Sequence, residues 1–198
     1  MSSAPASFAL LLLIGLVSVI AFSAPRVAER NLLRPYHVLR RRDFIPLITC
    51  GFIHANWSHL IFNALTLYFF GPNLERTIGT PRFVALYFIG LVLSSAGTVW
   101  KHRDDPNYAS LGASGAILAV LFAYIVYYPT QMLYLYFAIP IPAVLFAFGY
   151  LAYTIWASKN PHGGINHDAH LDGALTGLLF VALTDFGAWQ RAFDQVLG

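Results

Sequence analysis

The sequence has little charge and almost no cysteine. Lys, Arg, Asp and Glu together make up 11% of the 198 residues, whereas soluble domains carry about 25%. With 58% hydrophobic residues and a mean hydropathy of +0.61, the composition excludes an ordinary soluble domain and predicts an integral membrane protein. A single cysteine, Cys50, excludes an internal disulfide and a thiolate metal site. The length leaves no room for a sizeable soluble domain beside a membrane bundle, so we expect one domain over residues 1–198.

Positive charge is absent from the beginning of the sequence, because no Lys or Arg precedes Arg26. A secretory signal peptide carries a positively charged segment before its apolar run, so we expect the run from Phe8 to Phe22 to be a retained membrane span. The segment 24–48 then interleaves arginines with apolar side chains, which predicts an amphipathic connection in the membrane interface. Such a basic run favours membrane lipids with anionic headgroups as partners over nucleic acid. The arginines are Arg26, Arg30, Arg34, Arg40, Arg41 and Arg42.

Apolar runs separated by polar turns predict an all-α membrane protein with six transmembrane helices. Ile139-Pro140-Ile141-Pro142 is expected to begin the fifth helix, because proline is tolerated in a first helical turn. The aromatic segment from Gln131 to Ile139 is expected to lie at the membrane interface. The predicted spans are approximately 7–23, 51–71, 83–100, 114–128, 140–157 and 168–186.

One serine stands between glycines where a polar loop meets an apolar run, in Gly112-Ala113-Ser114-Gly115. At the start of a helix, free N–H groups and the helix dipole favour an oxyanion. The run from Ser114 to Tyr128 covers only about 22 Å at about 1.5 Å per residue, which is less than the roughly 30 Å of the hydrocarbon core. We therefore expect Ser114 to be recessed below the membrane surface. A helix-capping serine beside packing glycines is the alternative that the same residues allow.

Polar side chains recur at the starts of the even-numbered spans. His54 and His59 begin the second, Ser114 the fourth and His170 the sixth. Even-numbered spans run in the same direction, so these residues are predicted to meet at one side of the membrane. Ionisable residues inside a membrane are costly and are functional candidates. His59 and Asn63 are four residues apart and share a helix face.

The chemistry of these residue types favours a Ser–His dyad. A serine hydroxyl is a poor nucleophile until a base such as histidine takes its proton. The Ser114 N–H, the Asn63 amide and the His59 ring are available as donors to an oxyanion. Asp168 and Asp172 flank His170 at two residues on either side and point away from its face, so no orienting carboxylate is assigned. Gly173-x-x-x-Gly177, on the face of His170, is a small-xxx-small pattern that lets another helix approach closely.

These motifs resemble those of the rhomboid family of intramembrane serine proteases. The resemblance extends over about residues 43–180, in the order of the family. The matching patterns are His54-x-x-x-x-His59-x-x-x-Asn63 for HxxxxHxxxN, Gly112-Ala113-Ser114-Gly115 for GxSG, Ala169-His170-x-x-Gly173-x-x-x-Gly177 for AHxxGxxxG, and Gly71-x-x-x-Glu75-x-x-x-Gly79 for the turn after the second span.

The resemblance implies a rhomboid-like bundle with Ser114 as nucleophile, His170 as general base, and His59 and Asn63 in the oxyanion hole. It implies cleavage of single-pass transmembrane proteins within or near their membrane span, without a cofactor or a metal. Water would reach the site through a cavity capped by the loop before the sixth span. Structural roles are implied for His54, Gly112, Gly115, Gly173, Gly177 and Glu75.

The sequence departs from the family at two places. Ile45-Pro46 stands where many members have Trp-Arg, which affects the first connection. Leu118 stands where some members place an aromatic ring against the histidine. We therefore expect His170 to be held mainly by packing and by its bond to Ser114.

Two other functions fit parts of the sequence. A rhomboid-like protein without activity would bind membrane clients, although such relatives typically lack the serine or the histidine. A haem or metal membrane protein would use paired histidines, but it leaves the Gly-x-Ser-Gly pattern unexplained. Its candidate ligands are His54, His59, His167 and His170.

Two arguments predict opposite orientations of the chain in the membrane. Nine Lys and Arg residues fall on the odd-numbered connections and three on the others. The positive-inside rule would place the odd connections in the cytoplasm, whereas the family resemblance places them outside. We adopt the second orientation, because the arginines of 24–48 are expected to be interfacial. The compact sequence without a transit-like N-terminus favours a prokaryotic plasma membrane.

Overall fold

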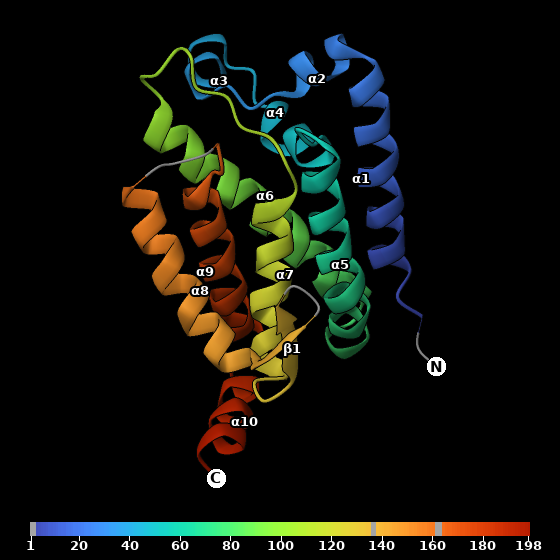
Figure 1. Cartoon of the computed structure of the whole chain (residues 1–198), viewed down its shortest axis with the longest axis vertical. Coiled ribbons are helices and arrows are strands. Elements are labelled where there is room, and N and C mark those ends of the chain that lie inside the picture. The colour runs from blue at the N-terminus through green and yellow to red at the C-terminus, as the bar shows by residue number, and fades with distance from the viewer. Residues whose placement is uncertain (1–2, 136–137, 161–163) are drawn as a thin grey trace.

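The computed structural model describes residues 3–135, 138–160 and 164–198, and it is a helical bundle built around the helix α7 (Figure 1). α7 lies between α5 and α9, and α6 also packs against it. Every residue of α7 from Gly115 to Val126 is buried, because a helix that is apolar on all sides hides its surface only in a central position. The bundle helices are α1 (Pro5–Ser23), α5 (Trp57–Ile78), α6 (Thr80–His102), α7 (Ser114–Tyr127), α8 (Ala143–Lys159) and α9 (His167–Thr184).

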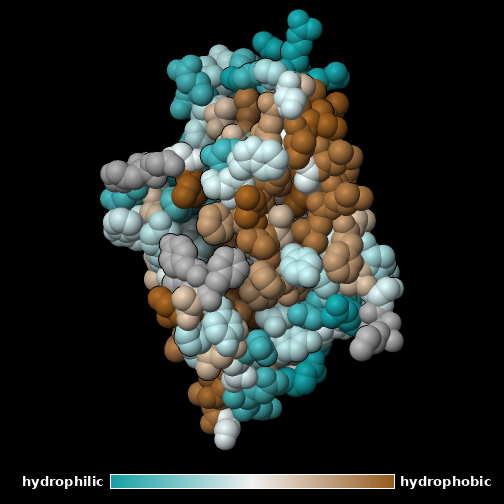
Figure 2. Space-filling model, turned by 45° about the vertical axis from the view of Figure 1, so that its right-hand side comes forward, coloured by the Kyte–Doolittle hydropathy of each residue, from teal (hydrophilic) through white to brown (hydrophobic). Residues whose placement is uncertain are grey.

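The outer surface of the bundle is apolar in its middle and polar at its ends. Figure 2 shows a brown band of hydrophobic residues between two teal regions, and large side chains such as Leu12, Phe148 and Leu183 are exposed. Among the described helices, α1 and α6 are long and apolar enough to cross a membrane. α9 and α10 (Phe186–Leu197), which meet at a bend of 108°, add a third span if they are counted together. These features belong to an integral membrane protein, and the count of six spans remains a prediction.

The expected start of the second span at residue 51 is wrong. The connection after α1 forms short helices that each begin at a proline, which is preorganised for a first helical turn. α5 begins only at Trp57, where the Asn56 side chain accepts a hydrogen bond of 2.9 Å from the His59 N–H. His54 therefore lies before this helix and not in its first turn. The short elements are α2 (Pro25–Asn31), α3 (Pro35–Arg41), α4 (Pro46–Thr49) and the 3-10 turn η1 (Cys50–Phe52).

The expectation that Ile139-Pro140-Ile141-Pro142 begins the fifth helix is also wrong, because an antiparallel hairpin precedes α8. Strands β1 (Met132–Leu135) and β2 (Ile139–Pro142) pair with Met132 opposite Pro142. Pro140 and Pro142 lack an N–H, which an edge strand tolerates and a helix interior does not. The fifth helix consequently begins at Ala143. Of the aromatic segment predicted at the interface, residues 136–137 lie outside the described residues.

Glu75 fastens the end of α5 to the beginning of α1. The side chain is 1% exposed and its carboxylate accepts hydrogen bonds from the Ala6 N–H at 3.0 Å, the Ser7 N–H at 2.7 Å and the Thr80 hydroxyl at 2.7 Å. A carboxylate at a helix N-terminus satisfies free N–H groups and complements the helix dipole. Gly79, at φ 83°, ends α5 in a backbone conformation that favours glycine. These contacts give a physical reason for the glutamate and the last glycine of the pattern Gly71-x-x-x-Glu75-x-x-x-Gly79.

Glu75→Gln is expected to lower the free energy of unfolding by about 3 kcal/mol. The amide removes the charge and turns one acceptor into a donor that faces donors, and a buried donor left unpaired costs about 1–3 kcal/mol. Unfolding in mixed detergent micelles measures the change. Glu29→Gln is the matched control, because Glu29 pairs with Arg34 while remaining 65% exposed, and exposed pairs contribute little. Equal stability of the two variants would contradict the role given to Glu75.

Candidate active site at the N-terminus of α7

The structure brings Ser114 and His170 together at one end of the bundle. The Ser114 Oγ and His170 Nε2 atoms are 2.9 Å apart. Ser114 is the first residue of α7, and His170 lies in the first turn of α9. Two segments separated by 56 residues are thereby joined by a hydrogen bond between a hydroxyl and an imidazole, which is the arrangement that proton transfer requires.

Glycines allow α9 to approach α7 closely enough for this bond. A Cβ atom on Gly173 would collide with the carbonyl of Gly115, and one on Gly177 would collide with the carbonyl of Ala119. A Cβ atom on Gly115 would collide in turn with the side chain of Ser94 on α6. The small residues predicted to form a helix contact do so, and the close packing of α7 and α9 sets the distance between Ser114 and His170.

His59 lies against the loop that leads to Ser114. Gly112 has φ 116°, and a Cβ atom there would lie 2.6 Å from His59 Cε1. Gly112 also donates its N–H to the Cys50 carbonyl at 2.9 Å. Glycine is thus required at this position both by its backbone conformation and by the neighbouring ring.

Asn63 lies one turn after His59 on the same helix. It is buried, and its side-chain amide donates to the His59 carbonyl at 2.9 Å. A side-chain amide has two N–H donors, so this bond leaves one of them available. In this structure the amide is engaged within α5 and is not bonded to Ser114.

His54 connects α1 to the ring of His59. Its Nδ1 atom is 2.8 Å from the Ser18 hydroxyl of α1, and its ring meets that of His59 edge to face at 4.9 Å between centroids. Ser18 is also 3.1 Å from the Phe52 carbonyl. His54 is therefore placed to support His59 from behind and does not reach Ser114.

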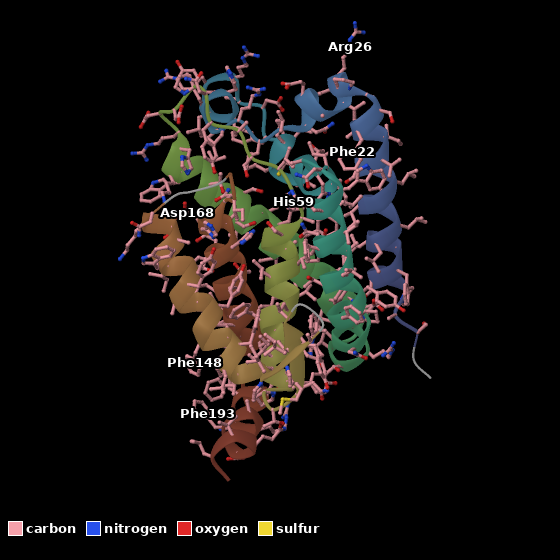
Figure 3. All side chains as sticks on the ribbon, in the orientation of Figure 1. Phe22, Arg26, His59, Phe148, Asp168 and Phe193 are labelled. Carbon is pink, nitrogen blue, oxygen red and sulfur yellow. The ribbon has the colours of Figure 1, made fainter. Side chains whose placement is uncertain are left out.

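The carboxylates near His170 face away from it, as their spacing predicts. Asp168 pairs with Lys101 at 2.6 Å, and the Asp172 carboxylate lies against Gly97 of α6. Figure 3 shows Asp168 and His59 at the same end of the bundle. No carboxylate is available to orient the imidazole among the contacts of the described residues.

Tyr150 is a neighbour of His170 that the sequence analysis missed. Its hydroxyl is 3.0 Å from His170 Nδ1, so His170 has a further hydrogen-bond partner besides the packing and the Ser114 bond that were expected to hold it. The chain has 11 tyrosines and 16 phenylalanines, and a tyrosine within the fifth apolar run carries no spacing signal that links it to the sixth. Only the packing of α8 on α9 makes this contact.

Asn166 is a second residue that was not expected at the site, although an asparagine just before an apolar run is a helix-start signal. Its side chain accepts from the Ala169 N–H at 3.0 Å, which caps α9. Its amide donates to the Thr98 hydroxyl at 2.9 Å and to the Ser110 hydroxyl at 3.1 Å. Asn166 therefore ties the start of α9 to α6 and to the loop before Ser114.

The histidines that were considered as metal ligands do not gather into one cluster. His54 neighbours His59, and the ring of His167 is 6.0 Å from that of His170. Within residues 3–135, 138–160 and 164–198, no three His, Cys, Asp or Glu side chains come together as ligands for a metal ion. Residues 161–163 of the predicted capping loop lie outside the described residues.

The fold and the site define a class, that of helical membrane proteins with a serine and a histidine paired at one end of the bundle. Within that class the sequence identifies the group. The family model of the Rhomboid domain matches residues 41–185, which is most of the chain. The protein belongs to the rhomboid family.

Individual relatives agree with this assignment. The chain is 32% identical over 160 residues to RHOMBOID-like protein 12, mitochondrial, of Arabidopsis thaliana, covering 73% of this chain and 45% of that protein. It is 29% identical over 158 residues to Rhomboid protein 1, mitochondrial, of Saccharomyces cerevisiae, covering 73% and 44%. It is 37% identical over 79 residues to the putative rhomboid protease YdcA of Bacillus subtilis, covering 40% and 39%.

The chain thus spans less than half the length of each of these three relatives. Two of them are mitochondrial proteins by name, which does not fit the expectation of a prokaryotic plasma membrane. Family and apolar helices agree on an integral membrane protein.

Proposed function

We propose that this protein is an intramembrane serine endopeptidase that cleaves single-pass membrane proteins within or near their transmembrane segment. The observation that carries the proposal is the 2.9 Å contact between Ser114 Oγ and His170 Nε2 at the N-terminus of a buried helix. A serine that served only as a helix cap would stand at the cap position and bond to backbone N–H groups, whereas Ala113 occupies the cap position of α7 and the Oγ atom of Ser114 is bonded to the imidazole.

In the proposed reaction, His170 Nε2 takes the proton of Ser114 Oγ as the oxygen attacks the substrate carbonyl carbon. The tetrahedral intermediate places negative charge on the carbonyl oxygen. As the C–N bond breaks, the imidazolium gives its proton to the leaving amine, and the acyl group remains on Ser114. Water, deprotonated by His170, then attacks the ester and releases Ser114 and the new carboxyl terminus.

The oxyanion is stabilised by donors that surround Ser114. The first N–H groups of an α-helix have no acceptor within the helix, so the Ser114 N–H is free to donate to the oxyanion. The His59 ring and the second N–H of the Asn63 amide complete the set. Positive helix-dipole charge at the start of α7 acts in the same direction.

The position of the serine accounts for cleavage inside a membrane. α7 has 14 residues and is about 21 Å long at about 1.5 Å per residue, shorter than a hydrocarbon core of roughly 30 Å. With six spans in the bundle, the loop before Ser114 dips below the surface and its backbone is satisfied by protein, as the Gly112–Cys50 bond illustrates. Water enters from the end at which Asp168 and His59 lie (Figure 3).

A fluorophosphonate probe tests the proposal on the purified chain in detergent and in liposomes. The wild type is expected to form a covalent adduct on the peptide that contains Ser114 and to cut a single-pass substrate in its apolar segment. Ser114→Ala is expected to lose both reactions, whereas Ser58→Ala, an exposed serine at the start of α5, keeps them. A well-folded wild type that neither labels nor cleaves would favour the client-binding alternative.

Asn63→Ala is expected to lower kcat/KM for substrate cleavage by about 10²-fold, because loss of one oxyanion donor costs about 10²–10³ in rate. Asn73→Ala is the matched control. Asn73 makes the same bond to the carbonyl four residues earlier, at 3.2 Å to Phe69, but it lies exposed near the other end of α5. Equal kcat/KM values for the Asn63 and Asn73 variants would contradict the assignment of Asn63 to the oxyanion hole.

A further inference from the structure

Both ring nitrogens of His170 have hydrogen-bond partners. Nε2 is 2.9 Å from Ser114 Oγ, and Nδ1 is 3.0 Å from the Tyr150 hydroxyl. A neutral imidazole carries its proton on one nitrogen only. For Nε2 to accept the serine proton, the imidazole proton must be on Nδ1, and this N–H then needs an acceptor. The Tyr150 oxygen is the acceptor that this structure provides.

The surroundings of Tyr150 favour this direction of the bond. Thr154 lies one turn further along α8 and is fully buried. Its own oxygen makes no hydrogen bond of standard geometry among the described residues. If Tyr150 donates its proton toward Thr154, its oxygen is free to accept from His170 Nδ1. The opposite arrangement would protonate Nε2 and prevent the imidazole from acting as a base.

The ring of Tyr150 is held in place from two sides. It stacks on Phe146 of the same helix at 5.6 Å and is tilted against Phe122 of α7 at 5.8 Å. α8 itself is weakly buried, with only Ala143, Thr154 and Ala157 in the interior, and Phe148 projects away from the bundle (Figure 3). The Tyr150 hydroxyl is consequently the point at which a peripheral helix contacts the dyad.

We infer that Tyr150 is a positioning residue that keeps the proton of His170 on Nδ1 and makes this state depend on the packing of α8. It takes the place that an aspartate occupies in a serine–histidine–aspartate triad, which neither Asp168 nor Asp172 fills here. The inference rests on the proposed function as far as its effect on rate is concerned. The effect on the imidazole itself does not depend on protease activity.

The test compares Tyr150→Phe with Tyr153→Phe, which makes the same change on the same helix beside His167. In ¹⁵N-histidine-labelled protein in micelles, NMR reports which His170 nitrogen carries the proton, with His170→Ala identifying the signals. We expect the proton on Nδ1 in the wild type and in Tyr153→Phe, and a mixture of both forms in Tyr150→Phe. Fluorophosphonate labelling by Tyr150→Phe is expected to be about tenfold slower, the value of one hydrogen bond, with KM for substrate unchanged.

The outcomes separate this inference from the proposed function. A Tyr150→Phe protein that keeps the proton on Nδ1 and labels at the wild-type rate overturns the role of Tyr150 and leaves the protease standing. A wild type that does not label but shows the shift of the proton in Tyr150→Phe supports the positioning role and overturns the protease. Thr154→Val, which removes the second hydroxyl, is expected to shift the proton in the same direction and serves if Tyr150→Phe does not fold.

A different observation concerns the arginines after α1. Arg26 and Arg30, one turn apart on α2, line a hollow of about 470 Å³ together with Val27, Asn31 and Ile45. Neither arginine forms an ion pair within the described part of the chain, whereas Arg34 is paired with Glu29. The hollow therefore offers two unpaired guanidinium groups.

The position of the hollow identifies what would fill it. Arg26 lies at the start of α2, just beyond the end of α1, and points away from the bundle (Figure 3). Apolar side chains of α1 such as Leu16 and Ile20 are exposed, and Ile45, which lines the hollow, is 68% exposed. Positive charge above apolar surface matches a phosphate above acyl chains. We propose that this hollow binds the headgroup of an anionic phospholipid.

Native mass spectrometry from micelles doped with phosphatidylglycerol tests this site. The wild type is expected to retain the lipid, and the Arg26→Gln/Arg30→Gln variant to retain at least tenfold less. Arg41→Gln/Arg42→Gln removes the same charge from α3 and its C-terminal end and is expected to bind as the wild type does. Equal losses of lipid in both variants would overturn the proposal. So would inorganic phosphate that competes for the site as well as the lipid itself does.

Discussion

Replacing His170 by alanine is expected to slow both fluorophosphonate labelling of Ser114 and substrate cleavage by about 10³-fold or more. The Ser114 hydroxyl would then lack the only base within hydrogen-bonding distance among the described residues, and general-base assistance contributes about 10²–10⁴. The protein is expected to remain folded, because the contact between α7 and α9 depends on glycines and not on the imidazole. Initial rates of labelling, with unfolding in micelles as a check on structure, measure the effect.

His167→Ala is the control for this prediction. His167 lies one turn earlier on α9, is buried, and packs near the same ring at 6.0 Å, but its Nδ1 has no hydrogen-bond partner among the described atoms. Its loss is expected to change the labelling rate by no more than about threefold, since no proton passes through it. If both variants lost the same amount of activity, a disturbed helix start would explain the result better than a missing base.

Gly173→Val is expected to be the most destabilising of these substitutions. The first carbon of the new side chain would occupy the space of the Gly115 carbonyl, so α9 and α7 would have to separate along the contact that holds Ser114 against His170. Overpacking in a core costs about 1–3 kcal/mol, and a collision with backbone leaves no side chain that can move aside. We expect a loss of about 3 kcal/mol or more in the free energy of unfolding, together with the loss of labelling.

Gly149→Val is the matched comparison, because a Cβ atom at Gly149 of α8 would meet no atom within 4 Å. In a helix valine is expected to stabilise slightly relative to glycine, so this variant should unfold at or above the wild-type denaturant concentration. A Gly173 variant that unfolds like the Gly149 variant would show that α7 and α9 are not in the contact described.

The parts of the site that could be predicted from sequence share a physical basis. Helical spacing alone decides that His59 and Asn63 lie on one face and that Gly173 and Gly177 lie on the face of His170. Composition decides that the chain enters a membrane, because a chain with so many apolar and so few charged residues leaves apolar surface that lipid covers better than water. A serine between glycines before a wholly apolar run marks the start of the most buried helix. Each of these is a property of a short segment or of the whole composition.

The remaining features depend on which segments meet. Pro140 and Pro142 fit the first turn of a helix as well as an edge strand, and only the pairing with β1 selects the strand. His54 lies outside the helix because the Asn56 cap begins α5 after it. Tyr150 reaches His170 because α8 packs on α9, a contact between two apolar helices that no residue pattern distinguishes from lipid exposure.

The sequence by itself therefore determined the membrane class and predicted the serine, the histidine and the glycines that meet at the candidate site, since helix periodicity and hydropathy act locally. The tertiary structure alone decided how the His170 ring is held, through Tyr150 at one nitrogen and Ser114 at the other. It also decided how α1 is held against the bundle, through Glu75 at the end of α5 and through His54 beside His59. Hydrogen bonds between distant segments depend on the packing of whole helices, and that packing is encoded by no single stretch of the chain.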